Sequence, residues 1–261
     1  IMPDGKALQM GTSHFLGQNF SKPFEVKFAD KDNVEHFAWQ TSWGVSWRLI
    51  GAMIMAHGDD KGLVLPPKVA PIQVVIVPIY RNDEGKDKVL PKVNEIKENL
   101  ESKDIRVHVD DRSELSPGYK FNDWELKGVP IRIEIGPKDI EKQSMVIAKR
   151  YNLEKSSLGF SEIEKIPSIL DEIQDNMLTK AKEEAKVNTI DISDYQEFKS
   201  KIEKGGFFNA PWCGKLECEE KIKEETGADI RVIPFGNEDE NQKCMYCQQK
   251  SVSIPIFARG Y

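Results

Sequence analysis

Long apolar runs, an excess of positive charge and scattered cysteines are all missing from this chain of 261 residues. No hydrophobic stretch approaches membrane-spanning length, and no basic segment followed by an apolar stretch opens the sequence as a secretion signal would. We therefore expect a cytoplasmic protein. The formal net charge of −6 argues against binding of nucleic acid through an overall positive field, so any RNA contact must use a local basic patch.

The length of the chain exceeds what one compact core usually takes, so we expect several domains. Paired prolines at 66 and 67 interrupt the backbone hydrogen bonding of a helix or strand and mark a boundary. We predict domains at 1–67, 68–167 and 168–261. The chain opens on Ile1 within a strand-and-loop pattern, so we also expect further protein before it.

The middle of the chain alternates strand-like and helix-like patterns. A mostly apolar run at 72–79 is typical of a strand buried on both faces, and Val89, Val93, Ile96 and Leu100 fall on one helical face. Further strands are predicted at 105–109, 131–135 and 145–148, with a short helix at 121–126. This order predicts an α/β domain with a mixed, mostly parallel sheet.

The flanking regions are predicted to be of other types. Residues 1–67 are rich in glycine and aromatic residues, with a short alternating stretch at 24–28 and a helix at 45–55. A long charged helix at 168–186 can connect two domains. The remainder reads as a small α+β domain with helices at 194–203 and 218–225 and strands at 207–208, 230–233 and 252–257.

All four cysteines lie near the end of the chain, in two close pairs, Cys213-x4-Cys218 and Cys244-x2-Cys247. Two such pairs on tight turns suit a tetrahedral Zn2+ site of four thiolates. A closed site of this kind leaves no position for substrate, so the metal would be structural. The alternatives are redox couples, disulfides or buried free thiols, and reducing conditions in the cytosol disfavour disulfides.

Residues 9–20 place side-chain donors and acceptors between glycines, which suits the wall of a ligand pocket better than a core strand. A single histidine such as His14 is, taken alone, more often structural than functional. The segment resembles the TSHxLGQNF stretch of prolyl-tRNA synthetases. Residues 41–48 and 57–67 resemble the class II motif 3 of that family, and 118–137 its anticodon-binding domain. The four-cysteine tail resembles the archaeal and eukaryotic-like branch.

The resemblance implies part of an antiparallel-sheet catalytic domain followed by the α/β and zinc domains. It also implies that the enzyme activates L-proline with ATP and Mg2+, then transfers the prolyl group to the 3′ end of tRNA(Pro). Such an adenylation needs the carboxylate held in line and the phosphate charge neutralised. Arg48, as the motif 3 arginine, is implied to clamp ATP, and His14 to be a second catalytic residue.

The resemblance implies further roles by position. Gln9, Thr12 and Ser46 would contact ATP together with Arg48, and His14 would border the proline pocket. Trp39, and Phe37 beside it, would line that pocket, although aromatic residues at this density are as often simple core. Trp47 departs from the small hydroxyl residue of the family's pattern, which puts the local packing against the nucleotide in question.

Unstacked anticodon bases are read by stacking and by hydrogen bonds to their edges. We expect the anticodon contacts among Lys120, Glu125, Arg132 and Lys138, near predicted strand ends, with Glu134 as an alternative acceptor. The alternative interpretation of this stretch is a solvated strand face with alternating charges.

Two hypotheses of different classes remain at this point. The first is a homodimeric proline-tRNA ligase, of which this chain alone would be inactive because class II motifs 1 and 2 lie elsewhere. The second is a stand-alone tRNA- or zinc-binding module related to such an enzyme.

Overall fold

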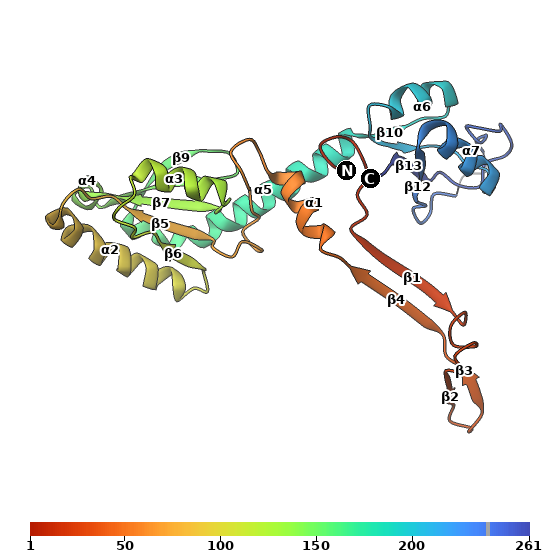
Figure 1. Cartoon of the computed structure of the whole chain (residues 1–261), viewed down its shortest axis with the longest axis horizontal. Coiled ribbons are helices and arrows are strands. Elements are labelled where there is room, and N and C mark those ends of the chain that lie inside the picture. Colours follow the sequence, from red (N-terminus) through yellow and green to blue (C-terminus); the bar gives the residue numbers. More distant parts are fainter. Residues whose placement is uncertain (239–240) are drawn as a thin grey trace. The chain divides into compact units, whose positions relative to one another are not determined.

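The computed structural model describes residues 1–238 and 241–261. It divides into two compact units, one made of Ile1–Ala52 with Val187–Tyr261 and the other of Met53–Lys186 (Figure 1). Within the described residues, no helix combines the length and the apolar character needed to cross a membrane. The division into domains at 1–67, 68–167 and 168–261 stays a prediction.

The unit Met53–Lys186 is built on a five-stranded sheet. Its strands are β5 (Val74–Pro78), β6 (Val107–Val109), β7 (Ile131–Ile135), β8 (Ser144–Lys149) and β9 (Lys155–Gly159), in the order β6-β5-β7-β8-β9. β5 pairs in parallel with β6 and β7, whereas β7–β8 and β8–β9 are antiparallel. The predicted mixed sheet is confirmed, with as many antiparallel pairings as parallel ones. β9 was not predicted, because this mostly exposed strand carries almost no apolar alternation.

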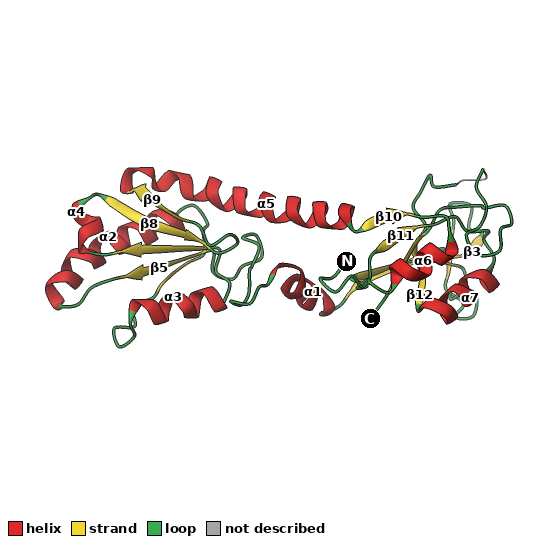
Figure 2. Ribbon diagram, turned by 90° about the horizontal axis from the view of Figure 1, so that it is seen from above, coloured by secondary structure: helices red, strands yellow, loops and turns green. Residues whose placement is uncertain are grey.

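Helices cover both faces of this sheet. They are α2 (Asp83–Glu101), α3 (Pro117–Leu126), the short α4 (Pro137–Glu141) and α5 (Ile166–Val187), with a 3-10 helix at Phe160–Lys165. The predicted stripe Val89, Val93, Ile96 and Leu100 on α2 is buried, and it shares one core with the first half of α5. Trp124 of α3 packs with Val75, Val77 and Val129 on the other face. Figure 2 shows α5 and α3 on opposite sides of the sheet.

The C-terminal part of the other unit is a small α+β fold. The sheet order is β10-β11-β13-β12, with β10 (Thr189–Asp191), β11 (Phe207–Asn209), β12 (Ala228–Val232) and β13 (Ile256–Arg259). Helices α6 (Tyr195–Ile202) and α7 (Leu216–Thr226) complete it. Phe198, Phe208 and Phe257 are fully buried and meet edge to face. The predicted α+β architecture is confirmed.

The first residues of the chain dock on this C-terminal fold through their backbone. Ala7 N donates to Arg259 O at 2.8 Å, and Gly206 N donates to Gly5 O at 2.8 Å. Gly5 has a φ of +77°, and a Cβ there would lie 2.8 Å from the Cα of Gly205. Only glycine allows this approach.

An antiparallel ribbon follows, made of β1 (Gly11–Gly17) and β4 (Gln40–Val45). A hairpin of β2 (Lys27–Ala29) and β3 (Glu35–Phe37) lies between them in sequence, and α1 (Arg48–His57) follows β4. The helix predicted at 45–55 therefore begins slightly later. Antiparallel pairing here is as expected for a part of a class II catalytic sheet.

Candidate functional site

A hollow of about 400 Å³ opens along the ribbon. It brings together five residues singled out from the sequence, namely Gln9, Thr12, His14, Ser46 and Arg48. The other lining residues are Met10, Gly11, Ser42, Trp43, Gly44 and Val45. Both β1 and β4 therefore contribute to one site, which is completed by the start of α1.

Strand alternation explains why these side chains share a face. Thr12 and His14 are two positions apart on β1, so they point to the same side of the ribbon. The register sets Thr12 opposite Gly44 and His14 opposite Ser42. A Cβ on Gly44 would meet nothing within 4 Å, so the backbone of β4 is open at this point. A strand glycine of this kind allows a ligand to approach the main chain closely.

Short contacts order the polar groups of the hollow. Gln9 Nε2 donates to Thr12 Oγ1 at 2.9 Å, and an Arg48 guanidinium nitrogen donates to Gln9 O at 3.3 Å. Ser46 Oγ accepts from the backbone N of Arg48 at 3.3 Å. His14 and Arg48 are exposed, and the described residues lining the hollow include no carboxylate. The exposed Arg48 guanidinium can therefore bind an anion that enters the hollow.

Trp39 lies outside the lining of this hollow. Its ring stacks on Phe15 with centroids 5.8 Å apart, and 68% of the residue's surface is exposed. The Phe37 carbonyl accepts from Gln18 Nε2 at 3.0 Å, and Lys27 Nζ lies 5.3 Å from the centre of the Phe37 ring. The two aromatic residues proposed for a proline pocket are thus not gathered around the polar hollow.

The charged stretch of β7 is buried, not solvated. Only 5% of Arg132 and 8% of Glu134 is exposed, because α3 covers this face of the sheet. Arg132 donates to Glu125 at 3.0 Å and to Glu134 at 3.1 Å, and its guanidinium lies 4.3 Å from the centre of the Phe121 ring. The alternative of a solvated strand face does not hold for these residues. Strand alternation alone cannot reveal a helix on the polar face.

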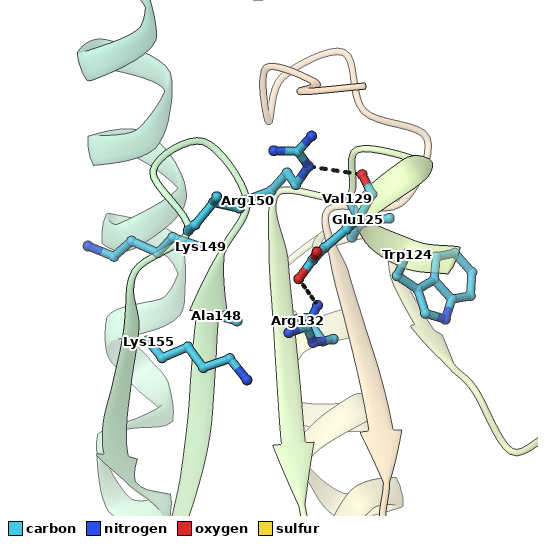
Figure 3. A pocket seen from close by; sticks show the side chains of 9 residues that line it. Trp124, Glu125, Val129, Arg132, Ala148, Lys149, Arg150 and Lys155 are labelled. Atoms are coloured by element: carbon cyan, nitrogen blue, oxygen red, sulfur yellow. Dashed lines mark hydrogen bonds and ion pairs between the residues drawn. The ribbon is translucent and has the colours of Figure 1, made fainter. Parts of the chain in front are cut away.

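A small cavity of about 20 Å³ lies beside this network (Figure 3). Arg132, Lys149, Arg150 and Lys155 line it together with Glu125. Lys155 Nζ also reaches Glu134 at 2.9 Å. Each described cation except Lys149 therefore has a carboxylate or carbonyl partner within this network, and Lys149 reaches Glu172 at 3.3 Å. The basic side chains around this cavity are therefore mainly engaged in internal contacts with carboxylates and carbonyls.

The other two predicted anticodon residues lie elsewhere. Lys120 is 4% exposed, and its Nζ donates to the carbonyl of Asp110 at 3.1 Å. Asp110 also accepts from Arg112 at 2.7 Å and from Trp124 Nε1 at 2.8 Å. Burial raises the pKa of this carboxyl, but these donors outweigh it and hold the pKa well below its usual range. Lys138 is exposed on α4, beyond the opposite end of β7 from Arg132.

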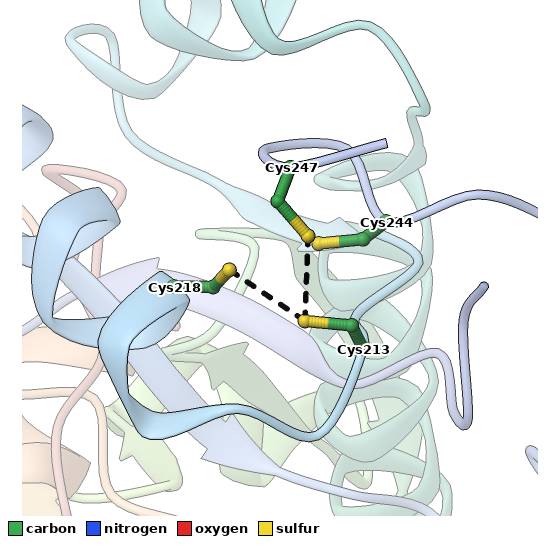
Figure 4. Close-up of side chains that lie close together, drawn as sticks. All are labelled: Cys213, Cys218, Cys244 and Cys247. Carbon is green, nitrogen blue, oxygen red and sulfur yellow. Dashed lines mark hydrogen bonds between the residues drawn. The ribbon is translucent and has the colours of Figure 1, made fainter. Parts of the chain in front are cut away.

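The four cysteines meet in one cluster (Figure 4). Their sulfur atoms all lie within 4.8 Å of one another, with Cys213 Sγ at 3.5 Å from Cys218 Sγ and 3.6 Å from Cys247 Sγ. All four are free thiols. Burial raises the pKa of Cys218 and of Cys244. The predicted convergence of the two pairs is present, and the disulfide alternative does not describe them.

Sequence reasoning missed several residues that organise these sites. Arg150 is buried and makes two hydrogen bonds to Asp59, at 2.8 and 2.5 Å. The terminal residue, Tyr261, donates its backbone N to Ala7 O at 3.4 Å, and Lys6 Nζ lies 5.0 Å from its ring centre. Such pairings join residues far apart in sequence, so no local pattern signals them. The glycine at 44 was the one local signal available for the open backbone.

Two family models match the chain. One, described as an anticodon binding domain, matches residues 73–168. The other, described as prolyl-tRNA synthetase, C-terminal, matches residues 195–261. The sheet with buried α2 and the cysteine domain thus each correspond to a known module.

Curated relatives match over the whole chain. A proline--tRNA ligase of Cenarchaeum symbiosum is 58% identical over 262 residues, covering 100% of this chain and 55% of the relative. A proline--tRNA ligase of Porphyromonas gingivalis is 51% identical, with 100% and 53% covered. The chain therefore spans about half the length of the curated relatives it matches.

Solved structures agree in fold. The prolyl-tRNA synthetase of Cryptosporidium parvum complexed with halofuginone and AMPPNP has a TM-score of 0.93 and 42% identity, covering 98% of this chain and 55% of that one. Its complex with L-proline and AMP has a TM-score of 0.92 and 41% identity, covering 98% and 54%. Identity at this level over both units, with two matching modules in order, leaves one assignment: the chain belongs to the prolyl-tRNA synthetase family.

Proposed function

We propose that the protein containing this chain is a proline-tRNA ligase, which activates L-proline with ATP and then charges tRNA(Pro). The observation that carries the proposal is the hollow on the ribbon, where Gln9, Thr12, His14, Ser46 and Arg48 converge. The related synthetase from Cryptosporidium parvum has been solved with AMPPNP and with L-proline and AMP. Those complexes support ATP and proline as substrates here.

In this proposal Arg48 binds ATP. Its guanidinium is always charged and exposed, and it faces a hollow whose described lining has no competing carboxylate. As the proline carboxylate attacks the α-phosphate, charge shifts toward the leaving pyrophosphate, and a fixed cation stabilises this shift. Gln9, Thr12 and Ser46 would orient the nucleotide and its Mg2+, while the bare backbone at Gly44 lets a flat base lie close.

The proline end of the site is proposed at His14, which is exposed within the same hollow. Trp39 would contribute an apolar wall only if the ligand, or further protein, reaches past β1 to the stacked Phe15–Trp39 pair. The exposed Phe15, Trp43 and Val45 leave ample apolar surface on the ribbon for such packing.

The unit Met53–Lys186 is proposed to bind the anticodon of tRNA(Pro). The matching family model supports this role for residues 73–168. Among the four proposed contacts, exposed Lys138 and half-buried Glu125 are the direct candidates. Arg132 and Lys120 are buried and committed to internal partners, so they would act by holding Glu125 and the α3 region in place.

The cysteine cluster is proposed to hold a structural Zn2+. Four thiolates at about 2.3 Å from a tetrahedral ion lie about 3.8 Å apart, which is close to the sulfur distances found here. Cys213, Cys218, Cys244 and Cys247 fill all four positions, so the ion would stabilise the fold without binding substrate. We also propose a homodimer, located in the cytoplasm.

The decisive experiment is proline-dependent exchange of pyrophosphate into ATP by the full-length protein. We expect exchange with proline, and a loss of at least about 100-fold for Arg48→Ala, as for removal of a group that stabilises developing charge. Arg81→Ala, which removes an exposed arginine outside the hollow, is the matched control. Absence of exchange with every amino acid, together with retained tRNA binding, would favour a tRNA-binding module instead.

A further inference from the structure

Tyr246 lies within the Cys244-x2-Cys247 turn, and its side chain packs against the cysteine cluster while its hydroxyl reaches beyond it. Its hydroxyl donates to Glu225 Oε1 at 3.1 Å. Glu225 lies in the last turn of α7, and Cys218 lies near the start of the same helix. One carboxylate therefore joins the second cysteine pair to the helix that carries a ligand of the first.

The other oxygen of Glu225 is held by α6. Glu225 Oε2 accepts from Lys199 Nζ at 2.8 Å and from Tyr195 OH at 3.0 Å. The Tyr195 and Tyr246 rings also meet edge to face, with centroids 5.0 Å apart. Because Lys199 and both hydroxyls favour the charged form, the pKa of Glu225 is lowered. Glu225 is exposed, but three donors hold the two oxygens of its carboxylate in place.

The neighbouring residue also anchors the turn. Met245 is fully buried in the core with Phe198 and Phe257. Its backbone N donates to Pro211 O at 2.9 Å, two residues before Cys213. Both residues between Cys244 and Cys247 are therefore tied to fixed parts of the fold, Met245 through packing and a backbone hydrogen bond and Tyr246 through its hydroxyl.

We propose that Glu225 and Tyr246 are positioning residues of the metal site, which set the Cys244–Cys247 pair against the Cys213–Cys218 pair before the ion binds. The proposal rests on the zinc site proposed above. A thiolate site gains affinity when its ligands are already held in the bound geometry, and supporting hydrogen bonds around the ligands are a usual means of holding them.

The test uses the reduced, metal-free 261-residue chain titrated with Zn2+ against a chromophoric chelator, and with Co2+ followed by thiolate absorption. Tyr246→Phe removes only the hydroxyl and keeps the ring contact with Tyr195. We expect Zn2+ affinity to fall about fivefold in Tyr246→Phe, which removes one hydrogen bond to the carboxylate, and about tenfold in Glu225→Gln, which removes the negative charge that Lys199 and both hydroxyls share. The double variant should lose less than the product, because both changes break the same contact.

Glu224→Gln is the matched control, since Glu224 is an exposed neighbour paired only with Lys221 among the contacts described. It should bind Zn2+ as the unchanged chain does. Metal-free melting of Tyr246→Phe should stay near that of the unchanged chain, which separates positioning from general stability. Equal affinity of the unchanged chain and both variants would overturn the inference while leaving the zinc site intact. Failure of the unchanged chain to bind either ion would overturn both.

Discussion

Arg132 illustrates how a residue's role depends on what covers it. The alternation of Arg132 and Glu134 with isoleucines fits a half-solvated strand, but α3 closes over this face and leaves both charges buried. A buried charge is stable only while its partners are in place. Arg132 forms ion pairs with both Glu125 and Glu134, so its first role is to offset the cost of burying these two carboxylates.

We predict that Arg132→Ala lowers the free energy of unfolding by about 3 kcal/mol, because Glu134 loses a buried partner. Lys138→Ala should change it by less than about 0.5 kcal/mol, since Lys138 is exposed. Denaturant unfolding of both variants measures the difference. If Arg132→Ala were as stable as the unchanged chain, the buried network would not have the strength proposed for it. Aminoacylation by the full-length variants then separates anticodon contact at Lys138 from folding effects at Arg132.

At the scale of elements, the segment after α1 is attached to α3 and β8. Leu63 N donates to Leu126 O at 3.0 Å, and Leu65 N donates to Gly128 O at 3.2 Å. A Cβ on Gly128 would lie 2.6 Å from Leu63, so the two backbones are in direct contact. Arg150 at the end of β8 completes the attachment by pairing with Asp59 and with the Glu125 carbonyl. The segment 59–65 is thereby joined to the α3 region that carries Glu125.

This attachment should respond to acid. The hydrogen bond from Arg150 holds the pKa of Asp59 at about 2, below that of an unfolded aspartate. A carboxyl with a lowered pKa in the folded state stabilises the fold fully above the unfolded pKa, near 4, and loses that contribution as the pH falls toward 2. Asp59→Asn should therefore flatten the stability curve between about pH 4 and 2.

At neutral pH we expect Asp59→Asn to lower the free energy of unfolding by roughly 1–2 kcal/mol. The value is below that for a fully buried pair because the Asp59 side chain is partly exposed. Chemical unfolding from pH 2 to pH 7 measures both effects. Asp60→Asn, at the exposed neighbour, should leave the curve unchanged. If Asp59→Asn lost stability between pH 4 and pH 2 as steeply as the unchanged chain, the acid sensitivity would not come from Asp59.

At the scale of the whole molecule, the two units have separate cores. One core joins the five-stranded sheet to α2 and α5, and another surrounds Phe198, Phe208 and Phe257. The cysteine cluster lies beside the second core only, sharing Trp212 and Tyr246 with it. Because that core contains three fully buried phenylalanines, we expect the C-terminal fold to keep part of its stability without a metal.

We predict that calorimetry of the metal-loaded chain resolves two unfolding transitions, and that a chelator lowers the temperature of one of them. When the free ion concentration is about 1,000 times the dissociation constant, removing the ion lowers the free energy of unfolding of the unit that binds it by about 4 kcal/mol. The transition of the unit Met53–Lys186 should stay in place, since the described part of that unit contains no cysteine. A chelator-induced shift of both transitions would show that the cores do not unfold independently.

Much of the molecule was predictable where local patterns carry the information. Three features are each visible within a short stretch of sequence: the α2 stripe, the apolar strand at β5 and the two cysteine pairs. Each is confirmed in position. The polar segment from Gln9 to Thr12 and the arginine after β4 indicated one site, and both line the hollow. The sequence pattern did not predict β9, because an exposed strand at the edge of a sheet needs few apolar residues.

Motifs and short-range periodicity along the chain were enough to indicate the family, the alternating elements and the residue types of each candidate site. The burial of Arg132, the pairing of Arg150 with Asp59 and the contact of Tyr246 with Glu225 became visible only in the folded chain. Each of these pairings joins surfaces brought together by packing. The free energy of a charged side chain depends on that packing, and no window along the chain contains it.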